Sequence, residues 1–131
     1  MSIVNSVATF TGVGAQLYQK TASLSGTGQQ TNTISSISPA VTRGYIRYKV
    51  SNGAGTSPTL VDVVVTCTDG TTTVTIEKYH PSTADTLSTT AWTDRVADFI
   101  VDINANSFSI LTTMGGTSPL ATLDFEVCAE P

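Results

Sequence analysis

Three stretches in the middle of the chain alternate apolar and polar side chains with a period of two. They are RGYIRYKVSNG at residues 43 to 53, TLVDVVVTC at 59 to 67 and TTTVTIEKY at 71 to 79. Successive side chains of an extended strand point to opposite faces, so this period indicates strands with one buried face. In the first stretch we expect the buried side chains to be Ile46, Tyr48 and Val50.

The second and third stretches are separated by Asp69-Gly70. Two-residue hairpins favour this dipeptide, because type I′ turns need positive φ at both central positions. We therefore predict a β-hairpin over residues 59 to 79, with a surface rich in threonine hydroxyls.

Composition supports the same fold class. Charged residues make up 12% of the chain, against roughly 25% in typical proteins, and serine and threonine take their place. Thr, Val, Ile and Tyr favour strands because branched or aromatic side chains pack well on a pleated surface. Seven or eight short strands separated by turn signals predict an all-β fold, an antiparallel β-sandwich or jelly-roll-like barrel.

A chain of 131 residues is long enough for one domain. We interpret residues 1 to 42 as a polar N-terminal arm with the first strands, part of the same unit as a β-sandwich core at 43 to 131. Short strands are expected at 16 to 24 and 33 to 37. The tract SGTGQQTNT at 25 to 33 is expected to be the loosest part.

The segment TDRVADFIVDI at 93 to 103 fits two structures. A helix would place its apolar residues on one stripe opposite three aspartates, whereas a strand would place Phe99 and its alternate neighbours on one face. We favour a strand that forms a hairpin with 107 to 113 through the Asn104-Ala105-Asn106 turn.

Loops are expected around Pro81, at 80 to 92, and at the Met114-Gly115-Gly116 tract. A last strand, at 121 to 128, places Leu123, Phe125 and Val127 inward.

Two cysteines stand far apart without metal-ligand spacing. The strand pattern places Cys67 on an apolar face and Cys128 on a polar one with Asp124 and Glu126. Two free thiols are favoured, and a bridge that fixes the C-terminal strand is the alternative.

No catalytic motif is present. One histidine, His80, is too few for a zinc site, and the chain has no nucleophile elbow for a triad, so we interpret His80 as an ordinary loop or strand-end residue. Asp94, Asp98 and Asp102 recur every four residues and are interpreted as a solvated face, with a calcium or glycosidase site as the alternative. We expect a protein that is not an enzyme and needs no cofactor or metal.

Charge is divided unevenly along the chain. The first 61 residues contain four cations and no acid, and the remaining residues contain all ten acids and two cations. These charges either neutralise one another within the domain or form poles that dock neighbouring copies or a partner. The candidate binding residues share one strand face and are Arg43, Tyr45, Arg47 and Lys49. They favour a protein partner, with an ordinary solvated face and a nucleic-acid-binding face as the alternatives.

A small, Thr/Ser/Gly-rich β domain without catalytic motifs resembles, in overall character, the capsid decoration or cement proteins and minor virion proteins of tailed bacteriophages. The resemblance covers the whole chain and implies an oligomeric β domain that clamps capsomer junctions, with SGTGQQTNT in an arm on the shell. It implies the major capsid protein and copies of itself as partners. The first residues do not have the pattern of a signal peptide, so we expect this protein to be made in the host cytoplasm and to reside in the virion.

Two alternatives remain from the residues. The cationic strand YIRYKV also resembles the RNA-binding sheet of single-stranded RNA phage coat proteins. A tail-fibre or carbohydrate-binding module is the other alternative, with Trp92 as its sugar-stacking candidate, although a tryptophan in a small β domain is more often in the core.

Overall fold

The structure of the protein is a computed structural model that describes residues 16–52 and 56–130. All of its regular elements are strands, which confirms the predicted all-β class. Their bounds are β1 Gln16–Ser25, β2 Gly28–Ile34, β3 Val41–Asn52, β4 Thr56–Thr68, β5 Thr73–Tyr79, β6 Asp85–Thr86, β7 Thr93–Ala105, β8 Ser107–Thr117 and β9 Leu120–Ala129. Within these ranges there is no helix with the length and apolarity needed to cross a membrane.

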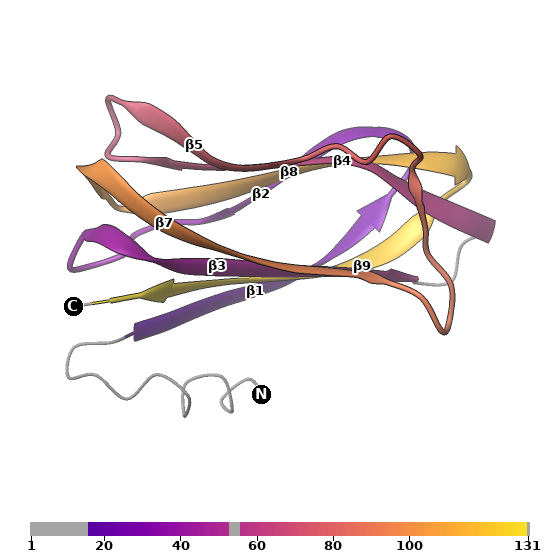
Figure 1. Ribbon diagram of the computed structural model, residues 1–131, viewed down its shortest axis with the longest axis horizontal. Coiled ribbons are helices and arrows are strands. Elements are labelled where there is room, and N and C mark those ends of the chain that lie inside the picture. Colours follow the sequence, from indigo (N-terminus) through magenta and orange to yellow (C-terminus); the bar gives the residue numbers. More distant parts are fainter. Residues whose placement is uncertain (1–15, 53–55, 131) are drawn as a thin grey trace.

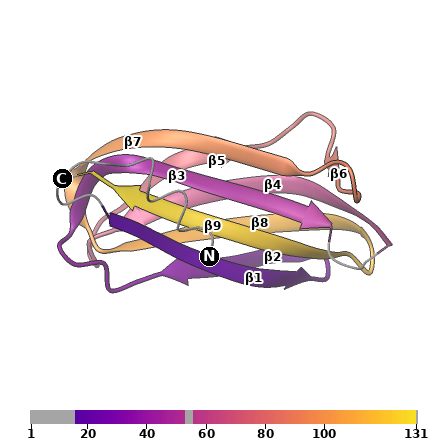
Figure 2. The ribbon, with the colours of Figure 1, turned by 90° about the horizontal axis from the view of Figure 1, so that it is seen from below.

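The strands form two antiparallel sheets packed face to face (Figure 1). Sheet A has the order β1-β9-β3-β7, as seen from below in Figure 2. Sheet B has the order β2-β8-β4-β5. The short β6 pairs with Thr59 and Leu60 of β4, next to the part of β4 that pairs with β5. The chain passes repeatedly from one sheet to the other, which is the arrangement of a double-sheet jelly roll. The predicted sandwich or jelly-roll fold is therefore confirmed.

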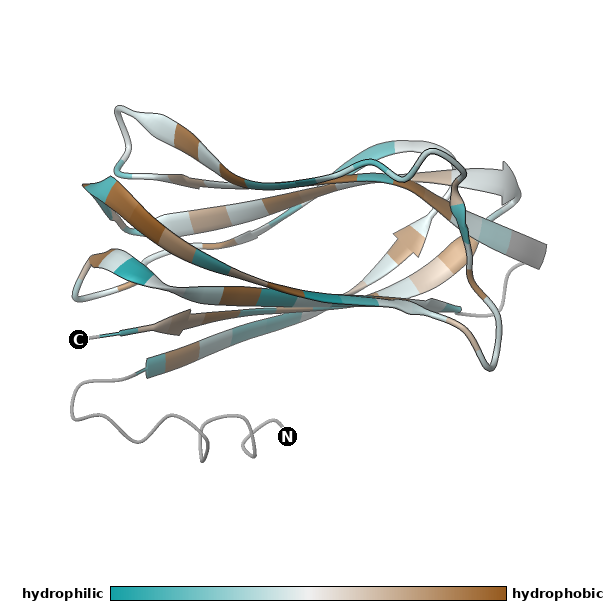
Figure 3. Cartoon of the chain, viewed as in Figure 1, coloured by the Kyte–Doolittle hydropathy of each residue, from teal (hydrophilic) through white to brown (hydrophobic). Residues whose placement is uncertain are grey.

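Alternation along the strands builds the core between the sheets. Hydrophobic and hydrophilic bands alternate along the ribbons in Figure 3, as the two-residue period requires. The predicted inward sets of β3 and β9 are confirmed, since each of their members is at most 1% exposed. The rings of Phe99 and Phe108 lie 5.2 Å apart at a 55° tilt, which joins β7 of sheet A to β8 of sheet B.

The hairpin over residues 59 to 79 is confirmed, because β4 and β5 pair antiparallel. Its turn differs from the two-residue prediction. Four residues, 69 to 72, connect the strands, and the Asp69 carboxylate accepts hydrogen bonds from the amides of Thr71 and Thr72 at 2.8 and 2.7 Å. These bonds lower the pKa of Asp69 and stabilise a wider loop, in which only Gly70 has positive φ.

The strand interpretation of residues 93 to 103 is confirmed, but the expected hairpin with 107 to 113 is wrong. β7 pairs with β3 in sheet A, whereas β8 pairs with β2 and β4 in sheet B. The short connection at Asn106 therefore carries the chain across the sandwich. Alternation fixes which side of a strand is buried, but either sheet provides a core-facing position for that side.

The tract SGTGQQTNT is not a loose arm. Ser25 ends β1, and residues 28 to 33 belong to β2, which pairs with β8 throughout. Asn32 and Thr33 are polar strand residues, and Thr33 shares a 2.8 Å hydrogen bond with Ser109. Ladder pairing thus overrides a composition that favours loops. The rest of the proposed arm, residues 1 to 15, lies outside the described residues.

Two smaller predictions also need correction. The Met114-Gly115-Gly116 tract continues β8 instead of forming a loop. Cys128 is fully buried although it points away from the sandwich interior, because β9 is a central strand and Leu17 of β1 and Tyr45 of β3 lie directly opposite it on either side. Both cysteines are free, as favoured.

One glycine is required by the close approach of two strands of sheet A. Gly44 of β3 has φ of +155°, and a Cβ at this position would lie 2.0 Å from the carbonyl oxygen of Cys128. Sheet A can therefore form in this register only because residue 44 lacks a side chain.

Candidate functional site

The four residues proposed as a binding face lie together on the outer surface of sheet A. They alternate with the buried residues of β3, so the predicted shared face is confirmed. Arg47 forms two hydrogen bonds with Asp94, from Nε to Oδ1 at 2.9 Å and from Nη2 to Oδ2 at 2.7 Å. This pairing lowers the pKa of Asp94 and raises that of Arg47.

The other two cations of this face also have intramolecular neighbours. Arg43 Nη2 lies 3.9 Å from Glu130 Oε1, and Lys49 Nζ lies 4.7 Å from the ring centroid of Trp92. Because β3 lies between β7 and β9, its cations stand beside acids from the second half of the chain. The uneven charges of the two halves therefore interleave on one face instead of forming opposite poles.

An exposed apolar pair lies beside these cations on β7. Val96 is 60% exposed and Ile100 is 83% exposed, and the register places them opposite Arg47 and Arg43. Around them on the same strand face are Asp94, Asp98 and Asp102. We call the outer surface of β3 and β7 the docking face. Its members are Arg43, Tyr45, Arg47, Lys49, Asp94, Val96, Asp98, Ile100 and Asp102.

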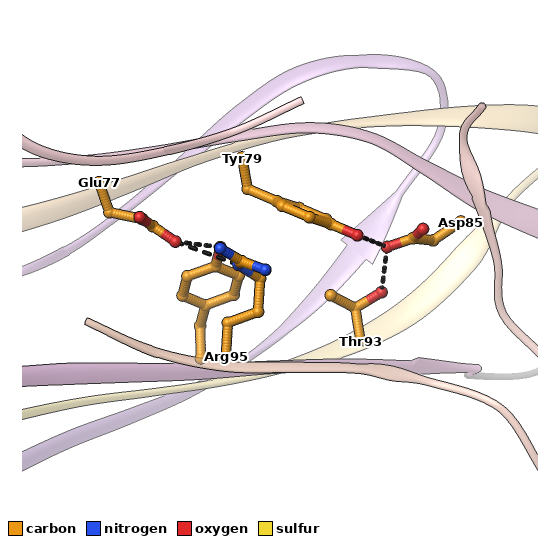
Figure 4. Close-up of polar contacts among 6 residues, drawn as sticks. Glu77, Tyr79, Asp85, Thr93 and Arg95 are labelled. Carbon is orange, nitrogen blue, oxygen red and sulfur yellow. Dashed lines mark hydrogen bonds and ion pairs between the residues drawn. The ribbon is translucent and has the colours of Figure 1, made fainter. Parts of the chain in front are cut away.

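A second polar cluster, which we call the edge network, joins the two sheets where β5 and β7 face each other (Figure 4). Glu77 Oε2 of β5 accepts hydrogen bonds from Tyr48 Oη at 3.0 Å and Arg95 Nε at 3.2 Å. Tyr48 is fully buried, and desolvation together with the Glu77 charge raises the pKa of its hydroxyl. A carboxylate near the sandwich edge is thus held by one donor from each of β3 and β7.

The edge network continues at the carboxylate of Asp85 on β6. Its Oδ2 accepts hydrogen bonds from Tyr79 Oη at 2.5 Å and from Thr93 Oγ1 at 2.8 Å. The guanidinium carbon of Arg95 lies 4.2 Å from the centroid of the Tyr79 ring, so its cation stacks on the aromatic face. Figure 4 shows Arg95 and Thr93 pointing from β7 toward Glu77, Tyr79 and Asp85.

A surface pocket of about 390 Å³ opens beside this network. β7 and the segment before it supply more than half of its lining, and β5 and β6 supply the rest. The lining residues are Tyr79, Asp85, Thr86, Trp92, Thr93, Asp94 and Arg95. We call it the edge pocket. Trp92 is 49% exposed here, so the expectation that it belongs to the core is wrong.

Sequence reasoning singled out Trp92 and Asp94 but missed the other residues of the edge pocket. They come from three elements, and their proximity depends on β5 and β7 being edge strands of opposing sheets. One weak signal was available: Asp85 is the only charged residue between His80 and Asp94.

The remaining chemical candidates stay apart. His80 is exposed, and its Nδ1 lies 3.4 Å from Asp62 Oδ1, as expected for a strand-end residue. Among the described residues no three His, Cys, Asp or Glu side chains gather as metal ligands. Burial raises the pKa of Cys67 to about 11, so this thiol is protonated at neutral pH.

No protein-family model and no curated protein sequence matches this chain. Solved structures do resemble it. The T13 particle of infectious bursal disease virus matches over 88% of this chain and 31% of that chain, with 14% identity and a TM-score of 0.50. The VP2 subviral particle of the same virus matches over 88% of this chain and 33% of that chain, with 13% identity and a TM-score of 0.50.

A third resemblance is to the CBM22-1 xylan-binding domain of Paenibacillus barcinonensis Xyn10C, over 89% of this chain and 85% of that domain, with 14% identity and a TM-score of 0.46. This chain spans about a third of the length of the viral chains. At these identities the resemblance concerns the fold alone, which is a jelly roll of the type found in viral capsid proteins.

Proposed function

We propose that this chain is a structural component of a virus particle, and specifically a decoration protein that stabilises a tailed-bacteriophage head at its capsomer junctions. The observation that carries the proposal is the exposed apolar pair, Val96 and Ile100, on an edge strand of a capsid-type jelly roll. Large exposed apolar side chains on a sheet edge favour contact with another protein surface. The role is one of binding, without catalysis.

The charges of the docking face favour a protein partner over nucleic acid. Arg47 is already neutralised by Asp94, and acids outnumber cations on the outer side of sheet A. The acids of its strands are Asp94, Asp98, Asp102, Asp124 and Glu126. The docking face itself has three cations and three acids, so it offers phosphates no net attraction, which an RNA-binding coat protein must provide. It suits a capsid surface that presents apolar side chains flanked by lysine or arginine.

Attachment to a lattice does not require a large interface for each copy. A repeated shell offers many equivalent sites, and copies that associate with one another gain avidity from simultaneous contacts. We therefore propose both the major capsid protein and further copies of this chain as partners.

The test is binding of the purified chain to phage heads assembled without it, measured by co-sedimentation. Complete burial of an isoleucine is worth about 1.5–3 kcal/mol, so Ile100→Glu should weaken binding at least about tenfold. Its matched control is Leu120→Glu, which changes another exposed apolar residue, 38% exposed, on β9. The control should bind like the wild type.

Thermal unfolding checks that both variants remain folded, since neither side chain is in the core. Wild-type occupancy by Ile100→Glu would refute the docking face. Capture of RNA by the wild-type chain, with loss of that capture in Arg43→Glu, would refute the assignment of a protein partner.

A further inference from the structure

The edge pocket combines three features that a small polar ligand needs. It is concave, with a volume of about 390 Å³, near the lower end of the roughly 300–1,000 Å³ usual for ligand sites. It has a half-exposed indole at Trp92. It also has hydroxyl, carboxylate and guanidinium groups around that ring.

The polar groups of the pocket are held in place before any ligand arrives. Both hydrogen bonds to Asp85 end on Oδ2, so Oδ1 provides an acceptor for a further donor. Arg95 is fixed between the Glu77 carboxylate and the face of the Tyr79 ring. Donors and acceptors that are already fixed lose little entropy when a ligand binds. Their preorganisation therefore favours binding of a ligand that makes only a few contacts.

The charges indicate a neutral ligand. Each charged group at the pocket has a partner of opposite sign or an aromatic neighbour: Asp94 is paired with Arg47, and Arg95 with Glu77. An anionic ligand would meet the carboxylates of Asp85 and Asp94, and a cationic one would meet Arg95 and Lys49. A neutral ligand with adjacent hydroxyl groups matches this lining, because each hydroxyl can donate a hydrogen bond to a carboxylate and accept one from a guanidinium.

We propose that the edge pocket binds the pyranose ring of a neutral saccharide. The apolar C–H face of the sugar stacks on Trp92, and vicinal hydroxyls hydrogen-bond with Asp85 Oδ1 and the guanidinium of Arg95. Lys49, 4.7 Å from the ring centroid, packs on the same indole and orients it. The site shares Asp94 and Lys49 with the docking face but does not include the apolar pair, Val96 and Ile100, so it adds a second activity to the proposed attachment to a capsid.

The chain itself supplies the readout, because Trp92 is its single tryptophan. A titration of the full chain with oligosaccharides of glucose, galactose, mannose, xylose and N-acetylglucosamine should shift the emission of Trp92 to shorter wavelength for at least one of them. Sialyllactose and oligogalacturonate are the anionic probes, and they should leave the emission unchanged. Calorimetry with the responding sugar then gives the dissociation constant.

Variants locate the site. Trp92→Ala should abolish the calorimetric signal, and Asp85→Asn should weaken binding at least about tenfold, since one acceptor is exchanged for an amide. Ile100→Glu is the matched control and should bind the sugar normally while losing attachment to heads. Trp92→Ala should retain attachment, so failure of either proposal is distinguishable from failure of the other.

No response to any neutral sugar at 10 mM would overturn the inference. Binding of the anionic probes alone, or undiminished binding by Trp92→Ala, would overturn it as well.

Discussion

Replacement of Gly44 by alanine tests the close approach of β3 and β9 that sheet A requires. The added Cβ would lie 2.0 Å from the carbonyl oxygen of Cys128 and 3.2 Å from the Cα of Ala129. Both neighbours are backbone atoms of the central strand β9, so no side-chain rotation relieves the clash. β3 must move away, at the expense of its ladder with β9.

The expected loss is the sum of two effects. Positive φ costs a residue with a Cβ about 1–2 kcal/mol, and forced overpacking costs about 1–3 kcal/mol or more. Gly44→Ala should therefore reduce the free energy of unfolding by about 2–5 kcal/mol, a large part of the roughly 5–15 kcal/mol that holds a domain folded. For a chain of this size that corresponds to a fall in Tm of about 6–20 °C.

Gly70→Ala is the matched control. Gly70 also has positive φ, at +98°, but no atom lies within 4 Å of the position that its Cβ would occupy. It should lose only the conformational part, about 1–2 kcal/mol. Urea unfolding followed by the fluorescence of Trp92 measures both variants, with the slope of the transition as a check on two-state behaviour. Equal losses in the two variants would refute the steric argument.

Three further predictions concern the core. Thr112→Val should raise the free energy of unfolding by about 1 kcal/mol, because the fully buried hydroxyl of Thr112 has no hydrogen-bond partner among the described residues; urea unfolding that shows a loss would contradict this. Phe108→Ala should lower it by about 3–5 kcal/mol in the same assay, since the ring is fully buried against Phe99. Burial raises the pKa of Cys67 to about 11 from its ordinary value near 9. Above pH 9 the unfolded chain therefore holds fewer protons than the folded one, and stability should fall as pH rises from 9 to 11. Cys67→Ala should reduce that slope, and an unchanged slope would show that the thiol is not its source.

The sequence predicted the fold class and the strands that alternate cleanly. β3 and β9 each have one apolar and one polar face, so their inward residues could be read directly. The β4–β5 hairpin was predicted, but register shifts at Leu60/Asp62 and Val65/Thr66 interrupt its alternation, so its inward residues could not all be read in this way. The partner of β7 could not be predicted in this way. Its inward face, which includes Phe99, would be equally well buried in either sheet.

The sequence pattern also could not predict which residues on the outer faces of the sheets are buried. Cys128 lies on the polar face of β9, but its neighbours on β1 and β3 cover it, and they are distant in sequence. The candidate binding residues of β3 were placed correctly on one face, whereas their ion partners Asp94 and Glu130 depended on unknown strand order. The edge pocket required the meeting of β5, β6 and β7, which no local pattern encodes.

The strand order of sheet A has a consequence for how the chain folds. β9 is the last of the described strands but lies between β1 and β3, and within residues 16–52 and 56–130 it is the only strand that pairs with β1. During synthesis, residues 16 to 25 must therefore wait for residues 120 to 129 before they can join a ladder. Non-local pairing of this kind makes folding slow. A nascent chain that lacks β9 leaves β1 unpaired and one edge of β3 open, and both are exposed to aggregation until β9 is synthesised.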